Sequence, residues 1–203
     1  MVDYQVEQDL HIHTVFSKYD GAVVPEQTIS FITAVNHAKI LGISDHIESF
    51  NTLEEFKFYS SEVRNHGLFL GTEVDGHESV DFALQTQVDY FIYHCRDEKN
   101  DYRGAEMLLE TGKPVIIAHP YMMGTRLGKV NRNCIIEINN RYIWRFNWKE
   151  ELLPFRDQFR YVLGSDAHQP NWLNQNIAKH VANELNIEEY MVFPRGNEVL
   201  NDR

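Results

Sequence analysis

Histidine and carboxylate residues recur where short apolar runs of the chain end. The first are His11 and His13 in Asp-Leu-His-Ile-His-Thr, and the last are Asp166 and His168 in Gly-Ser-Asp-Ala-His. Between them the same placement recurs at Asp45, His46, Glu73, His94 and His119. Imidazoles and carboxylates bind transition-metal ions, and side chains from many strand ends converge only at the rim of a sheet or barrel. The pattern predicts a polynuclear metal site.

The spacing of these residues suggests how they would bind. Side-chain direction repeats every two residues in a strand, so His11 and His13 would point to one face and hold one ion. Asp166 and His168 are expected to act in the same way. Glu73 has two carboxylate oxygens and could bridge neighbouring ions. Asp45 is expected to accept a hydrogen bond from a metal-binding imidazole rather than to be a ligand itself.

The remaining histidines are assigned mostly to structural positions. His37 is predicted inside the first helix, His66 at a helix end and His180 within the last helix. His77 follows Glu73 by four residues, and we expect it to line the mouth of the site with Asp75 as a substrate contact.

Strand-like and helix-like segments alternate along the chain. Ile29, Ile32, Val35 and Ala38 have helical spacing after Pro25, with Gly42 following as a helix stop. Thr52 and Glu55 match a capping box, and a further helix around 105–110 is expected to stop at Gly112. Strand-like runs cover residues 6–13, 40–44, 68–72, 90–93, 115–118, 134–138 and 161–163.

This alternation predicts an α/β fold with a parallel sheet. Polar residues emerge at the carboxyl ends of the seven runs, which favours a closed or nearly closed barrel over a doubly wound sheet. A length of 203 residues fits one domain spanning 1–203. Cys95 and Cys134 are too far apart in sequence for a Cys-x-x-Cys site, so we expect both to be reduced, buried and in a cytoplasmic protein.

The chemistry-bearing residues also carry a family resemblance that covers nearly the whole chain. The sequence resembles the polymerase and histidinol phosphatase (PHP) family of metal-dependent phosphoesterases, whose motifs are matched in order by His11-x-His13, Asp20, Asp45-His46, Glu73, His94, His119 and Asp166-x-His168. The resemblance implies a distorted (β/α)7 barrel with up to three ions at the carboxyl ends of its strands. It implies the ligands His11, His13, Asp20, His46, Glu73, His94, His119, Asp166 and His168.

Phosphoester chemistry also requires positive groups for the phosphate. The loops after the fifth and sixth strands contain Arg126, Lys129, Arg132, Arg141 and Arg145. Arg126 and Arg141 are the favoured phosphate contacts, because guanidinium groups pair bidentately with phosphate. Trp144, Phe146 and Trp148 alternate after Arg141 and could form a wall for an apolar substrate group or pack in the core.

We therefore expect a hydrolase that removes phosphate from a small phosphomonoester. Two or three divalent ions, Zn, Mn or Fe, would lower the pKa of a water towards about 7 and neutralise the phosphoryl oxygens. Glu73 is assigned to the catalytic set with Asp166 and His168, and the last two are the nearest groups to protonate the leaving alcohol. The expected partner is a small phosphorylated molecule, with neither a membrane segment nor a predicted oligomeric state.

Three alternatives remain open. A nuclease of the same family would act on polynucleotides, but a net charge of −11 and the lack of a basic stripe argue against it. An amidohydrolase would share the opening His-x-His but fits Asp45-His46 and Glu73 less well. A non-enzymatic metal-binding scaffold would be favoured by missing ligands.

Overall fold

Seven parallel strands form the centre of the structure, a computed structural model that describes residues 6–193. The strands pair in chain order, each with the next. They are β1 (Val6–Asp9), β2 (Ala38–Ile43), β3 (Phe69–Asp75), β4 (Tyr90–His94), β5 (Val115–Ile117), β6 (Ile135–Asn139) and β7 (Arg160–Gly164). Each of the predicted strand-like runs overlaps one of them, and the prediction of a parallel α/β sheet is confirmed.

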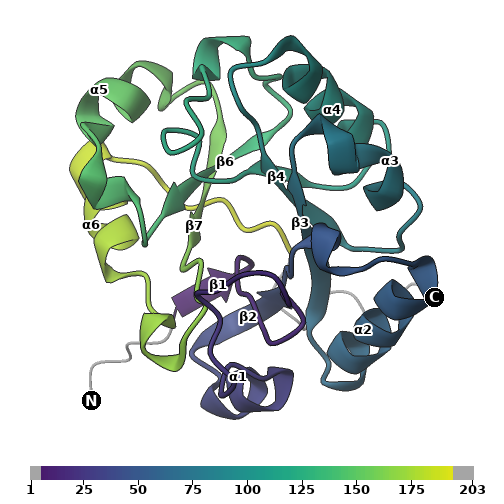
Figure 1. Cartoon of the computed structure of the whole chain (residues 1–203). Coiled ribbons are helices and arrows are strands. Elements are labelled where there is room, and N and C mark those ends of the chain that lie inside the picture. Colours follow the sequence, from purple (N-terminus) through teal and green to yellow (C-terminus); the bar gives the residue numbers. More distant parts are fainter. Residues whose placement is uncertain (1–5, 194–203) are drawn as a thin grey trace, which may run out of the picture.

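Helices cover the outer surface of the sheet (Figure 1). They are α1 (Ile29–Val35), α2 (Leu53–Asn65), α3 (Val80–Ala83), α4 (Lys99–Leu109), α5 (Trp148–Leu152) and α6 (Asn176–Leu185). The connection from β5 to β6 contains only a 3₁₀ turn, Leu127–Lys129, in place of an α-helix. The strand–helix repeat is therefore incomplete at this point.

The sheet curls until β1 and β7 are neighbours, which gives a nearly closed barrel. No continuous ladder joins these two strands within residues 6–193; beyond their ends, Ile12 and Ala167 form an isolated parallel bridge. The buried side chain of Gln175 spans the gap, because its amide nitrogen donates to the carbonyl oxygens of Gln8 at 2.9 Å and Leu163 at 2.8 Å. One amide side chain thus replaces part of the missing strand pairing.

The sheet separates two apolar cores. The larger lies between the outer face of the barrel and the helices. The smaller fills the barrel interior and consists of Leu10, Ile40, Tyr90, Ile92, Ile116, Ala118, Ile135 and Val162. The hydroxyl of Tyr90 donates to the carbonyl oxygen of Leu10 at 2.7 Å, and its ring lies against Gly42 and Gly71, where a Cβ atom would overlap it.

The end of the first helix corrects the sequence analysis. Helix α1 ends at Val35, because Asn36 adopts a left-handed conformation with φ of 46°. Ala38 and Gly42 belong to β2, so Gly42 is not a helix stop but makes room for Tyr90. His37 lies between α1 and β2, where its Nε2 contacts Asp9 Oδ2 at 2.8 Å.

Other local predictions are confirmed. Thr52 caps α2 by accepting a hydrogen bond from the Glu55 amide, and His66 follows the last residue of that helix. Helix α4 ends shortly before Gly112, which has φ of 75°.

Both cysteines are buried and unpaired. They pack in the larger core, as predicted.

The amino-terminal end of the barrel is covered by the segment that follows α6. In Figure 1 this segment runs from α6 across the barrel towards β3. Phe193 stacks on Phe69 of β3 with 4.0 Å between ring centroids, and Gln8 donates to the carbonyl oxygen of Tyr190 at 2.6 Å. The interior core is thereby closed at this end. Among residues 6–193, no helix combines the length and apolar character needed to cross a bilayer.

Candidate functional site

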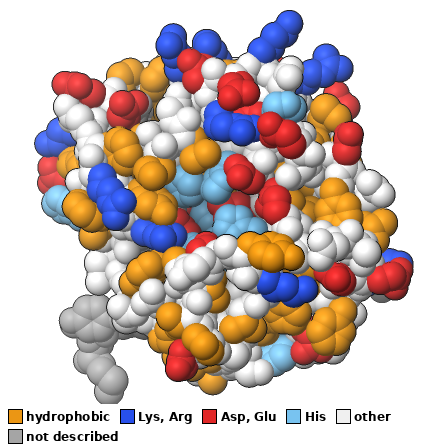
Figure 2. Space-filling model, viewed as in Figure 1, with side chains coloured by type: hydrophobic (Ala, Val, Ile, Leu, Met, Phe, Trp, Pro, Cys, Tyr) orange, Lys and Arg blue, Asp and Glu red, His pale blue; other side chains and the backbone are white. Residues whose placement is uncertain are grey.

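The residues predicted as ligands gather at the carboxyl ends of the strands. Their histidines line a hollow at the centre of the face shown in Figure 2. The cavity measures about 270 Å³, and its lining includes Asp20, His46, Glu73, His94, His119, Arg141, Asp166 and His168. His11 and His13 lie beneath it, almost without solvent exposure. All nine predicted positions therefore belong to one cluster.

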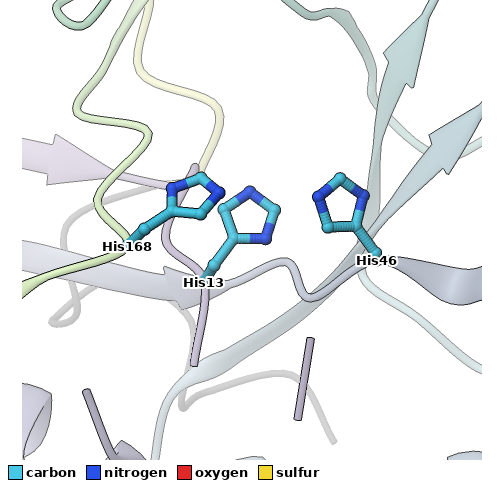
Figure 3. Close-up of side chains that lie close together, drawn as sticks. All are labelled: His13, His46 and His168. Atoms are coloured by element: carbon cyan, nitrogen blue, oxygen red, sulfur yellow. The ribbon is translucent and has the colours of Figure 1, made fainter. Parts of the chain in front are cut away.

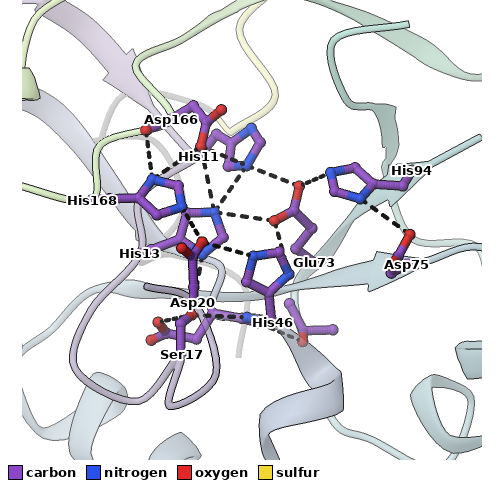
Figure 4. Close-up of polar contacts among 12 residues, drawn as sticks. His11, His13, Ser17, Asp20, His46, Glu73, Asp75, His94, Asp166 and His168 are labelled. Atoms are coloured by element: carbon purple, nitrogen blue, oxygen red, sulfur yellow. Dashed lines mark hydrogen bonds and ion pairs between the residues drawn. The ribbon is translucent and has the colours of Figure 1, made fainter. Parts of the chain in front are cut away.

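Glu73 lies at the middle of this cluster (Figure 4). Its Oε1 is 2.6 Å from His94 Nε2 and 3.1 Å from His11 Nε2. Its Oε2 is 3.1 Å from His13 Nε2 and 3.2 Å from His46 Nδ1. The two carboxylate oxygens thus face two different pairs of imidazoles, as required of a carboxylate that bridges two ions.

A second part of the cluster consists of three imidazoles from distant segments. His13 follows β1, His46 follows β2 and His168 follows β7, and their rings lie side by side (Figure 3). The His13 ring centroid is 4.1 Å from that of His168 and 4.6 Å from that of His46. Asp20 joins them, with its Oδ2 at 2.6 Å from His168 Nε2 and 3.4 Å from His46 Nε2.

Glu137 is a buried member of the cluster that the sequence analysis missed. One of its oxygens contacts His11 Nδ1 at 2.7 Å, and the other accepts the backbone N–H of His119 at 2.9 Å. Asn139 donates to the same oxygen at 3.0 Å. The signal in the sequence was an acidic residue inside the apolar run Cys-Ile-Ile-Glu-Ile, a position where an unpaired carboxylate would be costly.

Two cluster residues have a left-handed backbone. His119 has φ of 23° and Asp166 has φ of 52°. Residues other than glycine seldom adopt this region, although asparagine, aspartate and histidine do so several times more often than the rest, and the conformation costs on the order of 1 kcal/mol or more. These backbone conformations, just after β5 and β7, direct both side chains towards the cavity.

A change in alternation after β1 also turns histidines inward. Leu10 packs in the barrel interior, whereas Ile12 packs in the outer core. Strict alternation would have placed both on one face. The break between them lets His11 and His13 reach the interior cluster.

Burial and neighbouring charges shift the pKa values of the cluster residues, often in opposite directions. Burial raises the pKa of Glu73, but the surrounding imidazoles, His94 foremost, hold it well below its usual value. Burial lowers the pKa of His94, yet Glu73 and Asp75 raise it to about 10. Burial and the charge on His94 lower the pKa of His119 well below its usual value. His119 is thus neutral at pH 7, the form in which an imidazole binds a metal.

The donor set fits divalent metal ions. Ring nitrogens converge in pairs, with 3.2 Å between the Nε2 atoms of His11 and His13 and 3.1 Å between those of His94 and His119. Groups with ligand atoms close enough to share an ion are His13–His46–His168, His11–His13–Glu73, His11–His119–Asp166 and Glu73–His94–His119. Mixed nitrogen and oxygen donors of this kind suit Zn, Mn or Fe.

Asp45 orients imidazoles, as predicted, but it does so through intervening residues rather than by a direct hydrogen bond. Its carboxylate accepts hydrogen bonds from the Thr14 amide and hydroxyl and from the Ser17 hydroxyl, each at 2.6 Å. It contacts no imidazole directly in the described residues. Ser17 Oγ lies 3.2 Å from His13 Nδ1 and accepts the His46 N–H at 3.1 Å. Asp45 therefore orients these histidines through the loop that follows His13.

The predicted substrate contacts divide between two places. Arg141 lines the cavity, with its Nη1 at 3.3 Å from His168 Nδ1 and 3.6 Å from Asp166 Oδ1. Arg126 lies elsewhere; its side chain is 71% exposed and pairs with Asp97 at 2.7 Å. His77 Nδ1 contacts the buried Asp101 at 2.8 Å, and His77 does not line the cavity. Asp75 contacts His94 at 3.4 Å and lines an adjoining hollow rather than this cavity.

The rim of the cavity is electrically asymmetric. Basic and hydrophobic side chains adjoin the histidine-lined hollow on its left in Figure 2, and acidic side chains adjoin it on its right. The acidic side contains a second hollow of about 340 Å³, lined by Tyr19, Asp20, Gly21, His46, Glu48, Ser49 and Asp75. A molecule in the main cavity therefore meets opposite charges on its two flanks.

Comparisons of the sequence with models of known protein families and with curated proteins gave no match. The likeness to the PHP family rests on the identity and order of the clustered residues.

Proposed function

We propose that this chain is a metal-dependent phosphoesterase of the PHP type, with ions at the carboxyl end of a distorted (β/α)7 barrel. The main support is the position of Glu73 between two pairs of imidazoles. The proposed ligands are His11, His13, Asp20, His46, Glu73, His94, His119, Asp166 and His168. Two or three ions of Zn, Mn or Fe would supply the Lewis acidity that activates water and neutralises phosphoryl oxygens.

The protein groups around the cavity would carry out the remaining steps. The Arg141 guanidinium can pair with two phosphoryl oxygens, because its fork of N–H donors matches that geometry. Hydrolysis consumes one water, breaks the bond between phosphorus and the alcohol oxygen, and releases phosphate. His168 or Asp166, both beside Arg141, would give the departing alcohol its proton.

A small phosphomonoester is the proposed substrate class. The cavity of about 270 Å³ is close to the lower end of the roughly 300–1,000 Å³ range of small-molecule sites. Acidic residues line a hollow that adjoins it on one side, and a net charge of −11 disfavours extended contact with the phosphates of a polynucleotide. Both features support a small substrate over DNA or RNA.

Metal analysis and phosphate release test this function together. The purified protein should be stripped with a chelator, reconstituted with Mn, Zn or Fe, and analysed for bound metal. We expect two or three ions per chain and metal-dependent phosphate release that is faster from small monoesters than from diesters or short DNA. This activity should depend little on salt concentration, because few charged contacts are made to the substrate.

Three outcomes would contradict the proposal. Fewer than one tightly held ion per chain would remove the polynuclear site. Turnover confined to oligonucleotides and falling steeply with salt would favour the nuclease alternative. Full metal content without hydrolysis of any phosphoester would favour a metal-binding scaffold.

A further inference from the structure

An alternating stack of aromatic rings and guanidinium groups extends from the histidine cluster. The Arg141 Cζ lies 4.7 Å from the ring centroid of Trp172 and 4.8 Å from that of Tyr142. The Arg145 Cζ lies 5.2 Å from the centroid of Tyr142 and 5.1 Å from that of Trp144. We call these five residues the Arg–aromatic stack. Each contact is within the range of attractive cation–π interactions.

The inner end of the stack contacts the proposed metal ligands. Trp172 lies 5.9 Å from His168 and Tyr142 lies 5.1 Å from His119, measured between ring centroids. Trp144 Nε1 donates to the carbonyl oxygen of Arg141 at 2.9 Å, which ties the outer ring to the residue at the cavity. The stack therefore has a fixed position relative to the phosphate site.

At the outer end of the stack, the Trp144 ring and the Arg145 guanidinium are available to bind a ligand. The Trp144 side chain is 59% exposed, although it is among the largest apolar groups of the chain. Arg145 forms no ion pair with any residue from 6 to 193, despite the acidic excess of the protein. An exposed indole beside a guanidinium without an ion pair is complementary to a planar ring that carries hydrogen-bond acceptors.

Resting on the proposed phosphoesterase activity, we infer that the substrate is a nucleotide whose base lies on the outer end of the Arg–aromatic stack. Its phosphate would pair with Arg141 at the cavity, and its base would stack on Trp144. Arg145 would donate hydrogen bonds to ring-nitrogen or carbonyl acceptors of the base, or to a further phosphate. Every nucleobase has a stacking face, so this contact would select for a base without selecting one base strongly.

A pair of matched substrates tests this inference. Adenosine 5′-monophosphate and ribose 5-phosphate share the phosphoester, and only the first has a base. Wild-type kcat/KM should be at least about tenfold higher for the nucleotide, the value of one base–aromatic stack. Trp144→Ala should remove most of this preference, mainly through KM, and Trp144→Phe should restore much of it.

Arg132 supplies a matched control at the other end of β6. Its guanidinium also stacks on an aromatic ring, 4.4 Å from the centroid of Phe159, but it precedes the strand whereas Arg145 follows it. Arg145→Ala should reduce the nucleotide preference, and Arg132→Ala should leave it unchanged. Equal kcat/KM for the two substrates, or an equal loss for both in Trp144→Ala, would overturn the inference.

Calorimetric measurement of binding tests the stacking inference independently of the proposed phosphoesterase activity. The metal-loaded protein is titrated with each of the two compounds, so that no turnover is required. Tighter binding of adenosine 5′-monophosphate that is lost in Trp144→Ala would support the stack even if neither compound is hydrolysed. Equal affinity for both compounds would overturn it, whatever the activity assays give.

Discussion

The two ends of the barrel interior differ in composition although the same strands form both. Along β4 the inward residues change from Tyr90 and Ile92 to His94, and along β6 from Ile135 to Glu137 and Asn139. The first end is apolar and covered by residues 187–193, whereas the second is polar and open. Because side chains on one face recur every two residues, a single strand can contribute to the core and to the site.

The apolar end of the barrel mainly stabilises the fold, whereas the polar end holds the residues of the proposed metal site. The polar end brings buried carboxylates and imidazoles together and contains two left-handed residues, all of which disfavour folding. The apolar end offsets this cost by burying hydrocarbon, at roughly 25 cal/mol per Å² of apolar surface. Substitutions at the polar end should therefore change metal binding and hydrolysis, and substitutions at the apolar end should change the free energy of unfolding.

The largest effect is expected for Glu73→Gln at the polar end. The amide loses the negative charge and one of two strong acceptors, so bound metal should decrease and most hydrolysis should disappear. Elemental analysis and phosphate release measure the two effects.

His66→Ala is the control for Glu73→Gln. His66 caps the end of α2 outside the cluster, and its loss should cost no more than about 1 kcal/mol of stability with metal and activity retained. Wild-type turnover in Glu73→Gln with full metal content would refute the proposed mechanism, and metal loss in His66→Ala would show that the ligand set is wrong.

Glu137→Gln should have a smaller effect at the same end. The carboxylate orients His11 and holds the His119 backbone, and loss of such a partner weakens metal affinity by about 10- to 100-fold. Competition with a fluorescent chelator measures this affinity. Unchanged affinity would mean that neither histidine depends on Glu137.

Phe193→Ala tests the apolar end. The ring stacks on Phe69 and contacts Tyr90, so its removal should lower the free energy of unfolding by about 1–3 kcal/mol. Metal content and kcat/KM of the folded protein should stay at wild-type values, as measured below the melting temperature. A selective loss of bound metal would show that the two ends are coupled.

The smallest effect concerns Glu189, which contacts Gln8 at the covered end. Burial raises its pKa from the usual 4.5 to about 7, so the folded protein holds this proton more tightly than the unfolded chain. Stability should therefore fall by up to about 2 kcal/mol as pH rises from about 5 to about 7, and Glu189→Gln should remove this part of the slope. Urea denaturation at several pH values measures it; an identical slope in the variant would contradict the assignment.

Local patterns of the chain predicted the strands and most of the cluster. An apolar run that ends in His94 or His119 indicates both a buried strand and the polar group at its end. The spacing of residues was therefore enough to predict these strands and the cluster members that follow them. The same reasoning failed at Gly42, because a glycine after a helical pattern suits a helix stop as well as a close contact with Tyr90.

The choice among the arginines also required the fold. Arg126 and Arg141 both follow strands whose ends border the cavity, but Arg141 comes directly after β6 and lines the cavity, whereas Arg126 lies further along its loop and pairs with Asp97. The sequence of a loop does not show where a charged side chain points, because that depends on how the loop packs in the folded protein.

The sequence by itself determined the alternating elements, the number of strands and the kinds of side chain at their carboxyl ends, because these depend on periodicity and residue chemistry over short distances. Tertiary structure decided that Glu137 supports His11, that the chain after β1 turns His11 and His13 inward, and that residues 187–193 close the opposite end. Each of these depends on contacts between segments far apart in the chain, which local patterns do not encode.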